Sequence, residues 1–311
     1  MKSERCECLF IHTGLGVVDA PGRKSSYVPP ENVDIELEEL MNQLTWRKTV
    51  EDYSLLALTF EKDIFSALSG VAHQHKQIRG SSYFAGLWED SFVEDLLWHT
   101  RPRNFPVPSD YRFSGPVSRP SIWRAPTWSW ASVKSPVEYD RYEEFDTMLN
   151  DIYPCVGLVA EETGELEEDG TSLFISGYAT DIALKYGTIQ RENQHNHPET
   201  YLEMDGNKID AVRLYPDFDI WSESDQKIED GTMVYCLLLG SAMNHFFKQC
   251  GTLYFLVLAL DNSKEDEDDE DEVVFVKRIG LGTFSKEAFD SGKVSKFWEA
   301  ISGRLRSFIV S

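Results

Sequence analysis

Three polar side chains lie close to tryptophans in the sequence and could act on a small molecule. Arg124 and His99 each directly follow a tryptophan, and Tyr83 precedes one by five residues. An arginine or a tyrosine can polarise a carbonyl by a hydrogen bond. A histidine can supply the acid that helps a water molecule leave. We therefore predict Arg124, His99 and Tyr83 as candidate catalytic residues.

Tryptophans are concentrated between residues 82 and 133, which hold five of the eight in the chain. Each indole buries about 150 to 250 Å² when it is enclosed, so these rings must pack in a core or form the wall of a pocket. For the pocket we predict the substrate-binding residues Trp88, Trp98, Trp123, Trp128, Trp130 and Arg112. Arg124 could hold a flat, conjugated, anionic ligand there. The alternative is that the indoles are core residues and that Arg124 forms a structural ion pair or stacks on an indole.

The sequence has no motif typical of a serine hydrolase, of a nucleotide-binding enzyme or of a metal site. The chain has no G-x-S-x-G elbow, no glycine-rich phosphate loop, no H-E-x-x-H and no G-x-G-x-x-G. The five cysteines form no C-x-x-C pair, and the H-x-H at His195 and His197 has no convincing third ligand nearby. The run of Asp and Glu from 261 to 272 lacks the spacing of an EF-hand loop. We expect no metal and no cofactor.

Two blocks of the sequence carry a resemblance to a known family. They are Y-x-A-G-L-W followed by L-L-W, from Tyr83 to Trp98, and R-A-P-T-W-S-W-A-S, from Arg124 to Ser132. Together with Trp46, Tyr53-Ser54 and the A-L-S-G at 67–70, they resemble the region downstream of the HET domain in fungal heterokaryon-incompatibility proteins. The effector module of that family would lie before residue 1. We therefore expect a free-standing relative of the tail.

The resemblance implies two hypotheses about function. In the first, the chain is a cytoplasmic enzyme of fungal secondary metabolism that acts on an apolar or conjugated small molecule without metal or nucleotide. Its reaction would be a dehydration or a cycloaddition, as in the hetero-Diels–Alderases that join a tropolone-derived quinone methide to a terpene. In the second, the chain is a regulatory or partner-binding module of the incompatibility system that lacks its effector domain. An enclosed cavity favours the enzyme, whereas an exposed apolar patch favours the module.

Helices are predicted in the first third and at the end of the chain. Apolar residues recur at near-helical steps in 31–60, 63–75 and 85–99, and again in 286–309. Five prolines between residues 100 and 121 argue against regular structure there.

Strands are predicted from residue 127 onward. Trp128 and Trp130 alternate with smaller polar residues after Pro126, which predicts a strand over 127–133 with both indoles on one face. Seven further apolar segments, many of them rich in β-branched or aromatic residues, follow up to residue 279 without helix-length spacers, so the sheet should be antiparallel.

The predicted fold is therefore α+β and forms a single compact unit over 1–311. A helical and loop part, 1–121, packs on a predominantly antiparallel β-sandwich or barrel, 122–285, and the C-terminal helix occupies 286–311.

Composition limits the partners. Hydrophobic residues make up 41% of the chain and aromatic residues 13%, which predicts a globular protein. The formal net charge of -23 argues against nucleic acid and anionic membranes, because such partners require clustered Lys and Arg. The expected partner is a small-molecule substrate.

Overall fold

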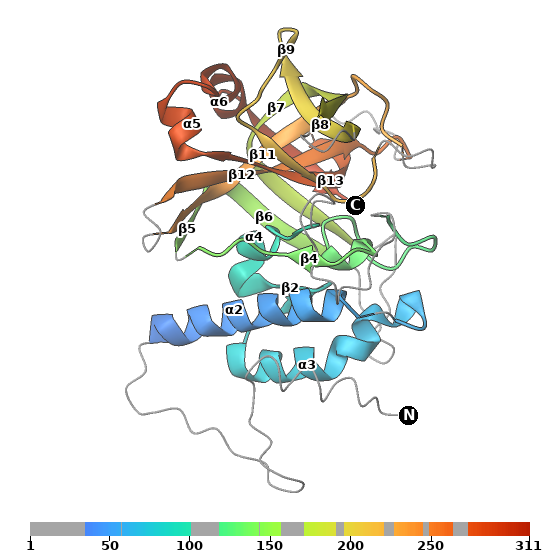
Figure 1. Cartoon of the computed structure of the whole chain (residues 1–311). Helices are drawn as coiled ribbons and strands as arrows, with labels where there is room; N and C mark the ends of the chain where they lie inside the picture. Colours follow the sequence, from blue (N-terminus) through green and yellow to red (C-terminus); the bar gives the residue numbers. More distant parts are fainter. Residues whose placement is uncertain are drawn as a thin grey trace, which may run out of the picture.

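The structure is a computed structural model in which two N-terminal helices lie below a large twisted sheet, and two short helices lie on its other side (Figure 1). It describes residues 35–56, 58–100, 118–142, 144–156, 171–190, 196–220, 227–244, 249–263 and 273–311. Arg112 and His195 lie outside these ranges.

The two N-terminal helices are α2, Ile35–Ser54, and α3, Ile64–Arg79, which follows the 3-10 turn η1, Glu61–Asp63. The buried residues of α3 are Ile64, Leu68, Val71, Ala72 and His75, which is the spacing of one helix face. Gly80 ends α3 in the left-handed conformation, with its N–H bonded to the Lys76 carbonyl. Both helices agree with the sequence pattern.

The predicted helix over 85–99 is wrong. The chain there forms a hairpin of β1, Tyr83–Phe84, and β2, Leu87–Trp88, then the 3-10 turn η2, Glu89–Ser91, the short helix α4, Phe92–Asp95, and β3, His99–Thr100. The cause lies in the turn, where Ala85 and Gly86 both have positive φ, as a two-residue hairpin turn requires. A helix cannot pass through such a pair.

The predicted strand over 127–133 is also wrong. Trp130–Ser132 form the 3-10 turn η3, and the Ser129 hydroxyl caps it by accepting a hydrogen bond from the Ala131 N–H. A serine that bonds its neighbouring backbone competes with strand pairing. Among the described residues of this segment, strand pairing begins only later, where β4, Val137–Glu138, pairs with β3.

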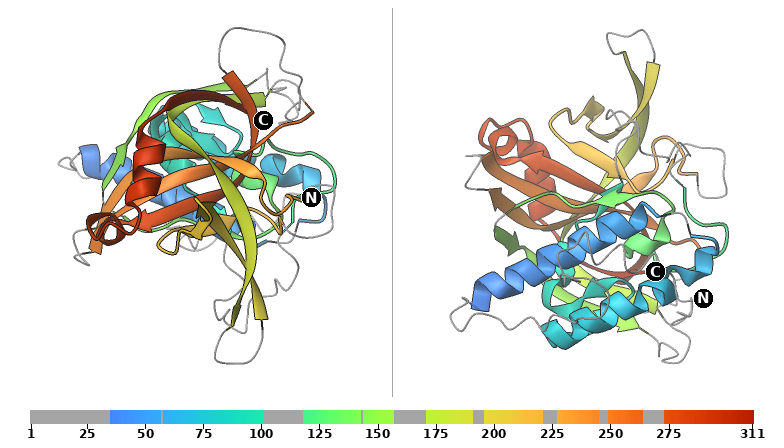
Figure 2. Two further views of the ribbon diagram at one scale, coloured as in Figure 1. Left: turned by 90° about the horizontal axis from the view of Figure 1, so that it is seen from above. Right: turned by 60° about the horizontal axis from the view of Figure 1, so that its bottom comes forward.

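The large sheet has ten strands among the described residues. They are β5, Glu144–Thr147; β6, Leu149–Val156; β7, Thr171–Gln190; β8, Asn196–Met204; β9, Asn207–Lys208; β10, Arg213–Pro216; β11, Met233–Asn244; β12, Gln249–Leu260; β13, Val273–Ser285; and β14, Leu305–Val310. All their pairings are antiparallel except that of β13 with β14. The far ends of β7 and β8 extend away from the rest as a hairpin (Figure 2).

Five strands of this sheet form a closed ring in the order β7, β11, β12, β13, β14 and back to β7. A ring with an odd number of strands cannot alternate direction all the way round, so one pair must be parallel. Here that pair is β13 and β14, and the crossover between them contains the helices α5, Lys286–Asp290, and α6, Ser295–Ser302.

Side chains alternate between two hydrophobic cores along the ring strands, as the period of two requires. On β12, Leu256 and Leu258 belong to a core shared with Trp46 and Val50 of α2, whereas Phe255 and Val257 belong to a core shared with Phe297 of α6. Both faces of the sheet are therefore covered.

The predicted helix over 286–309 is wrong in its second half. Gly292 has φ of +75° and separates α5 from α6, and after Gly303 the chain becomes strand β14. The α+β class and the mostly antiparallel sheet are confirmed. No helix among the described residues is long and apolar enough to cross a membrane.

Candidate functional site

Arg124 is held by backbone carbonyls of its own motif. Its guanidinium donates to the carbonyls of Ala131 and Val133 at 2.7 Å each, and to that of Glu61 at 3.3 Å. Burial lowers the pKa of Arg124, an effect that the nearby Glu61 opposes. These bonds fold the motif into its compact turn and fix it against η1. The donors with which Arg124 would bind a ligand are used for structure.

The predicted substrate-binding indoles form part of the core. Trp88, Trp98, Trp128 and Trp130 are at most 1% exposed, and Trp123 is half-buried. The indole N–H of Trp98 donates to the Trp128 carbonyl at 2.9 Å, and that of Trp130 donates to the Gly86 carbonyl at 3.0 Å. None of these five tryptophans lines the cleft described below. The alternative in which the indoles are core residues fits this geometry.

Tyr83 belongs to the same core. Its ring lies 4.9 Å from that of Trp88 and 5.5 Å from that of Trp46, and burial raises the pKa of its hydroxyl. No group among the described residues hydrogen-bonds this buried hydroxyl. Tyr83 does not line the cleft described below, so the structure offers no substrate site beside its hydroxyl.

A buried ion pair anchors the strand that carries His99. The Arg278 guanidinium binds Asp217 at 3.0 Å, donates to the carbonyls of Leu96 and Trp98, and stacks 3.6 Å above the Trp98 ring. Arg278 and Asp217 are both fully buried. The pair thus joins β13 to the chain just before His99.

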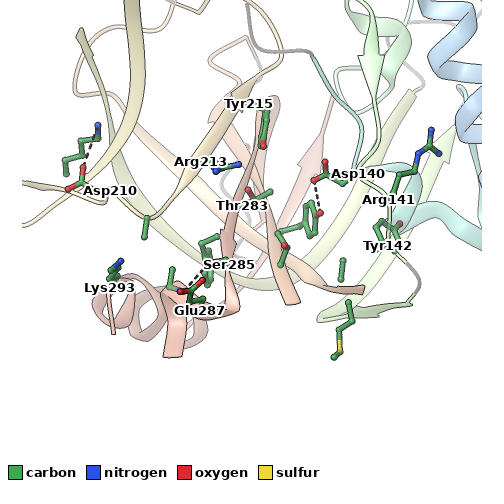
Figure 3. Close-up of a pocket in the computed structure, with 18 residues that line it drawn as sticks. Asp140, Arg141, Tyr142, Asp210, Arg213, Tyr215, Thr283, Ser285, Glu287 and Lys293 are labelled. Carbon is green, nitrogen blue, oxygen red and sulfur yellow. Dashed lines mark hydrogen bonds and ion pairs between the residues drawn. The ribbon is translucent and has the colours of Figure 1, made fainter. Parts of the chain in front are cut away.

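A cleft of about 1060 Å³ opens beside this anchored segment (Figure 3). Its walls come from the segment before β5, from the β9–β10 region and from β11, β12, β13 and the chain around α5. The lining residues are Asp140, Arg141, Tyr142, Lys208, Asp210, Ala211, Arg213, Tyr215, Ala242, Met243, Thr252, Tyr254, Thr283, Phe284, Ser285, Glu287, Ala288 and Lys293. The volume is that of a site for a small molecule.

Asp140 is a carboxylate of the cleft whose position and pKa are set by buried neighbours. One carboxylate oxygen accepts a hydrogen bond of 2.8 Å from the buried Tyr254 hydroxyl, and the other lies 3.5 Å from Nε2 of His99. Burial alone would raise the pKa of Asp140, but the contacts with His99 and Tyr254 outweigh it and lower the pKa. The Asp140 side chain is 42% exposed, so it reaches the cleft. It is therefore an ionised carboxylate at neutral pH.

His99 supports Asp140 from behind. Nδ1 lies 3.3 Å from the Thr100 carbonyl, and Nε2 faces Asp140, so both neighbours are acceptors. His99 is 5% exposed and its ring lies 4.5 Å from that of Tyr215. It is placed to position Asp140 and does not line the cleft.

Tyr215 is the second polar group of the cleft floor. It lies on β10, with Arg213 two residues earlier on the same face, and Thr283 of β13 lines the cleft beside it. The positive charge of Arg213 lowers the pKa of Tyr215, but burial outweighs this effect. Burial raises the pKa of Tyr215, so its hydroxyl is protonated at neutral pH. An ionised carboxylate and a protonated phenol thus line one cleft.

Sequence reasoning found His99 but missed Asp140, Tyr254, Tyr215 and Arg213. Asp140 lies a few residues after the tryptophan motif that ends at Ser132, in the polar and aromatic string Y-D-R-Y at 139–142. Arg213 and Tyr215 alternate along one strand. These signals are weak, because the sheet brings together residues that are more than 100 positions apart.

No family model, no curated protein and no solved structure matches the chain. The resemblance to heterokaryon-incompatibility proteins stays a prediction. Among the described residues, no group of three or more His, Cys, Asp or Glu side chains is placed to hold a metal ion.

Proposed function

We propose that the protein is an enzyme that performs acid–base chemistry on a small molecule bound in the cleft. The observation that carries this proposal is the carboxylate of Asp140, which accepts a hydrogen bond from the buried Tyr254, lies 3.5 Å from His99 and faces a cleft of about 1060 Å³. Structural ion pairs also shift pKa values. This one, however, leaves 42% of the carboxylate side chain exposed to the cleft.

Dehydration is the reaction that these groups fit best. Asp140 accepts a proton from a carbon of the substrate while the carbon–oxygen bond on the neighbouring carbon breaks. The departing hydroxide takes the phenolic proton of Tyr215 and leaves as water. The positive charge of the nearby Arg213 stabilises the resulting phenolate. The proton on Asp140 then returns to Tyr215 through solvent, which restores both groups.

This proposal keeps the predicted enzyme of secondary metabolism but moves its site from the tryptophans to the cleft. A cycloaddition needs orientation and one polarising hydrogen bond. It makes no use of an ionised carboxylate. A regulatory module of the incompatibility system would need no catalytic group at all.

The test is an activity screen with matched variants. Purified protein is incubated with a panel of hydroxylated, conjugated metabolites, and mass spectrometry follows the loss of one water. We expect turnover with at least one compound, and a fall of about 100-fold or more in Asp140→Asn and Tyr215→Phe. Asp146→Asn, an exposed carboxylate on β5 outside the cleft, is the control and keeps full activity.

Each other outcome contradicts the proposal. Turnover that Asp140→Asn leaves unchanged would favour a cycloaddition, for which orientation is enough. No turnover with any compound of the panel would favour the regulatory module.

A further inference from the structure

Basic residues outnumber acidic residues in the cleft, although acidic residues outnumber basic residues in the chain as a whole. The chain has 30 basic and 53 acidic side chains. The cleft lining instead has four basic residues, Arg141, Lys208, Arg213 and Lys293, and three acidic residues, Asp140, Asp210 and Glu287. In a strongly acidic protein, such a concentration of cations in a concave surface attracts an anion.

Two of the four cations are already neutralised. Arg141 binds Glu51 at 2.8 Å, and Lys208 binds Glu199 at 2.6 Å. By contrast, no carboxylate among the described residues lies within ion-pair distance of Arg213 or Lys293. Both side chains are exposed to the cleft.

We propose that the substrate carries an oxyanion, a carboxylate or a phosphate, which Arg213 and Lys293 bind. This inference rests on the proposed function, because it concerns the same cleft. Figure 3 shows Lys293 and Asp140 on opposite sides of the cleft, with Arg213 and Thr283 between them. The oxyanion at Arg213 and Lys293 thus leaves the reacting end of the molecule beside Asp140 and Tyr215.

The rest of the wall indicates the body of this substrate. Four aromatic residues contribute to the cleft lining; Tyr254 and Phe284 are buried, whereas the rings of Tyr142 and Tyr215 are half-buried. Flat, unsaturated molecules stack well on such rings. The substrate class is therefore an aromatic or conjugated acid. A guanidinium is suited to both oxyanions, because its planar fork binds two oxygens at once.

Three small probes test this subsite. Benzoate, phenyl phosphate and benzyl alcohol share one ring and differ in charge, and ligand-observed NMR titration measures their binding to the full chain. We expect at least one of the two anions to bind at least tenfold more tightly than benzyl alcohol. The stronger anion shows whether the subsite is for carboxylate or for phosphate. Equal binding of all three probes, or binding of none, overturns the inference.

Variants locate the subsite. Arg213→Gln and Lys293→Gln should each weaken binding of the preferred anion about tenfold or more. Lys286→Gln should leave it unchanged, because Lys286 pairs with Asp290 and does not line the cleft. If the two cleft variants bind the anion as tightly as the unmodified protein, Arg213 only balances the charge of Asp140, and the inference is wrong.

Asp140→Asn separates the two proposals. It should abolish turnover but retain or strengthen anion binding, because it removes a negative charge from the cleft. Full turnover in Asp140→Asn with normal anion binding would refute the proposed reaction and leave the subsite standing. If Asp140→Asn loses turnover but the unmodified protein binds the two anions no more tightly than benzyl alcohol, the proposed reaction stands and the oxyanion subsite is refuted.

Discussion

His75 is a buried histidine that the mechanism does not use. It lies on α3, 1% exposed, with its ring 5.1 Å from that of Trp46, and no group among the described residues hydrogen-bonds either ring nitrogen. Burial, assisted by the nearby Arg79, lowers the pKa of His75 from 6.5 to about 4. The folded protein therefore holds this ring neutral.

This shift predicts that stability falls in acid. Above pH 6.5 the ring is neutral in both the folded and the unfolded chain, so it has no effect. Below pH 6.5 only the unfolded chain takes up the proton, and the free energy of unfolding falls as the pH approaches 4. The full loss is about 3 kcal/mol. Urea unfolding between pH 7 and pH 4.5 measures it, and His75→Phe should show a weaker decrease.

His73 provides the control. It lies on the same helix but is exposed, so His73→Phe should keep the pH dependence of the unmodified protein. If His75→Phe and His73→Phe give the same slope of unfolding free energy against pH, then His75 is not the group responsible.

At the scale of residues, the sequence identified burial better than it identified function. Tryptophan density predicted enclosed rings, and four of the five rings between residues 82 and 133 are enclosed. Arg124 was recognisable as a special residue, but its partners are backbone carbonyls, which no residue pattern reveals. Asp140 gains its altered pKa partly from Tyr254, which is 114 positions away. Contacts of this kind depend on strand register, and the spacing of neighbouring residues in the sequence does not predict them.

At the scale of elements, the failed predictions over 85–99 and 127–133 share one cause. Apolar spacing suggested a helix over 85–99 and a strand over 127–133, but local backbone features changed both segments. Gly86 with φ of +97° makes a turn in the first, and the capping hydroxyl of Ser129 makes a 3-10 turn in the second. Long periodic segments such as α3 were predictable, because no such feature interrupts them.

Gly86 allows the most specific prediction at this scale. A Cβ added there would lie 2.4 Å from the indole nitrogen of Trp130, and positive φ is costly for any residue with a side chain. The Gly86 carbonyl also accepts the N–H groups of both Trp46 and Trp130, so neither ring can move freely. Gly86→Ala should therefore destabilise the protein by about 3 kcal/mol or more, measured by urea unfolding.

Gly70→Ala is the matched control. Gly70 lies within α3 and is exposed, and a methyl group added there would have no other atom within 4 Å. Alanine favours the helix there, so this variant should gain about 0.5 to 1 kcal/mol. Similar changes in both variants would show that the hairpin turn tolerates a side chain.

At the scale of the whole molecule, one core joins the helices to the ring of strands. Trp46 of α2 and Phe308 of β14 belong to the same buried cluster. Phe308 is fully buried and its ring lies 5.2 Å from that of Tyr235 on β11. The strand that carries it closes the ring against β7 and β13. A defect in β14 should therefore reach the tryptophans.

Phe308→Ala tests whether the chain unfolds as a single unit. We expect a loss of about 3 to 5 kcal/mol, because the substitution leaves a cavity in the shared core. Six of the eight tryptophans precede residue 131, whereas most strands follow it. Tryptophan fluorescence and far-UV circular dichroism thus report on different parts of the chain. Both transitions should shift together to lower urea concentration.

Leu305→Thr is the control for this strand. Leu305 also lies on β14 but is 49% exposed, so its replacement should change stability by no more than about 0.5 kcal/mol. If Phe308→Ala shifts the dichroism transition while the fluorescence transition stays in place, the helical part and the ring are separate folding units. Coincident shifts instead mean that ring closure by the last strand stabilises the tryptophan core, and with it the segment that places His99 behind Asp140.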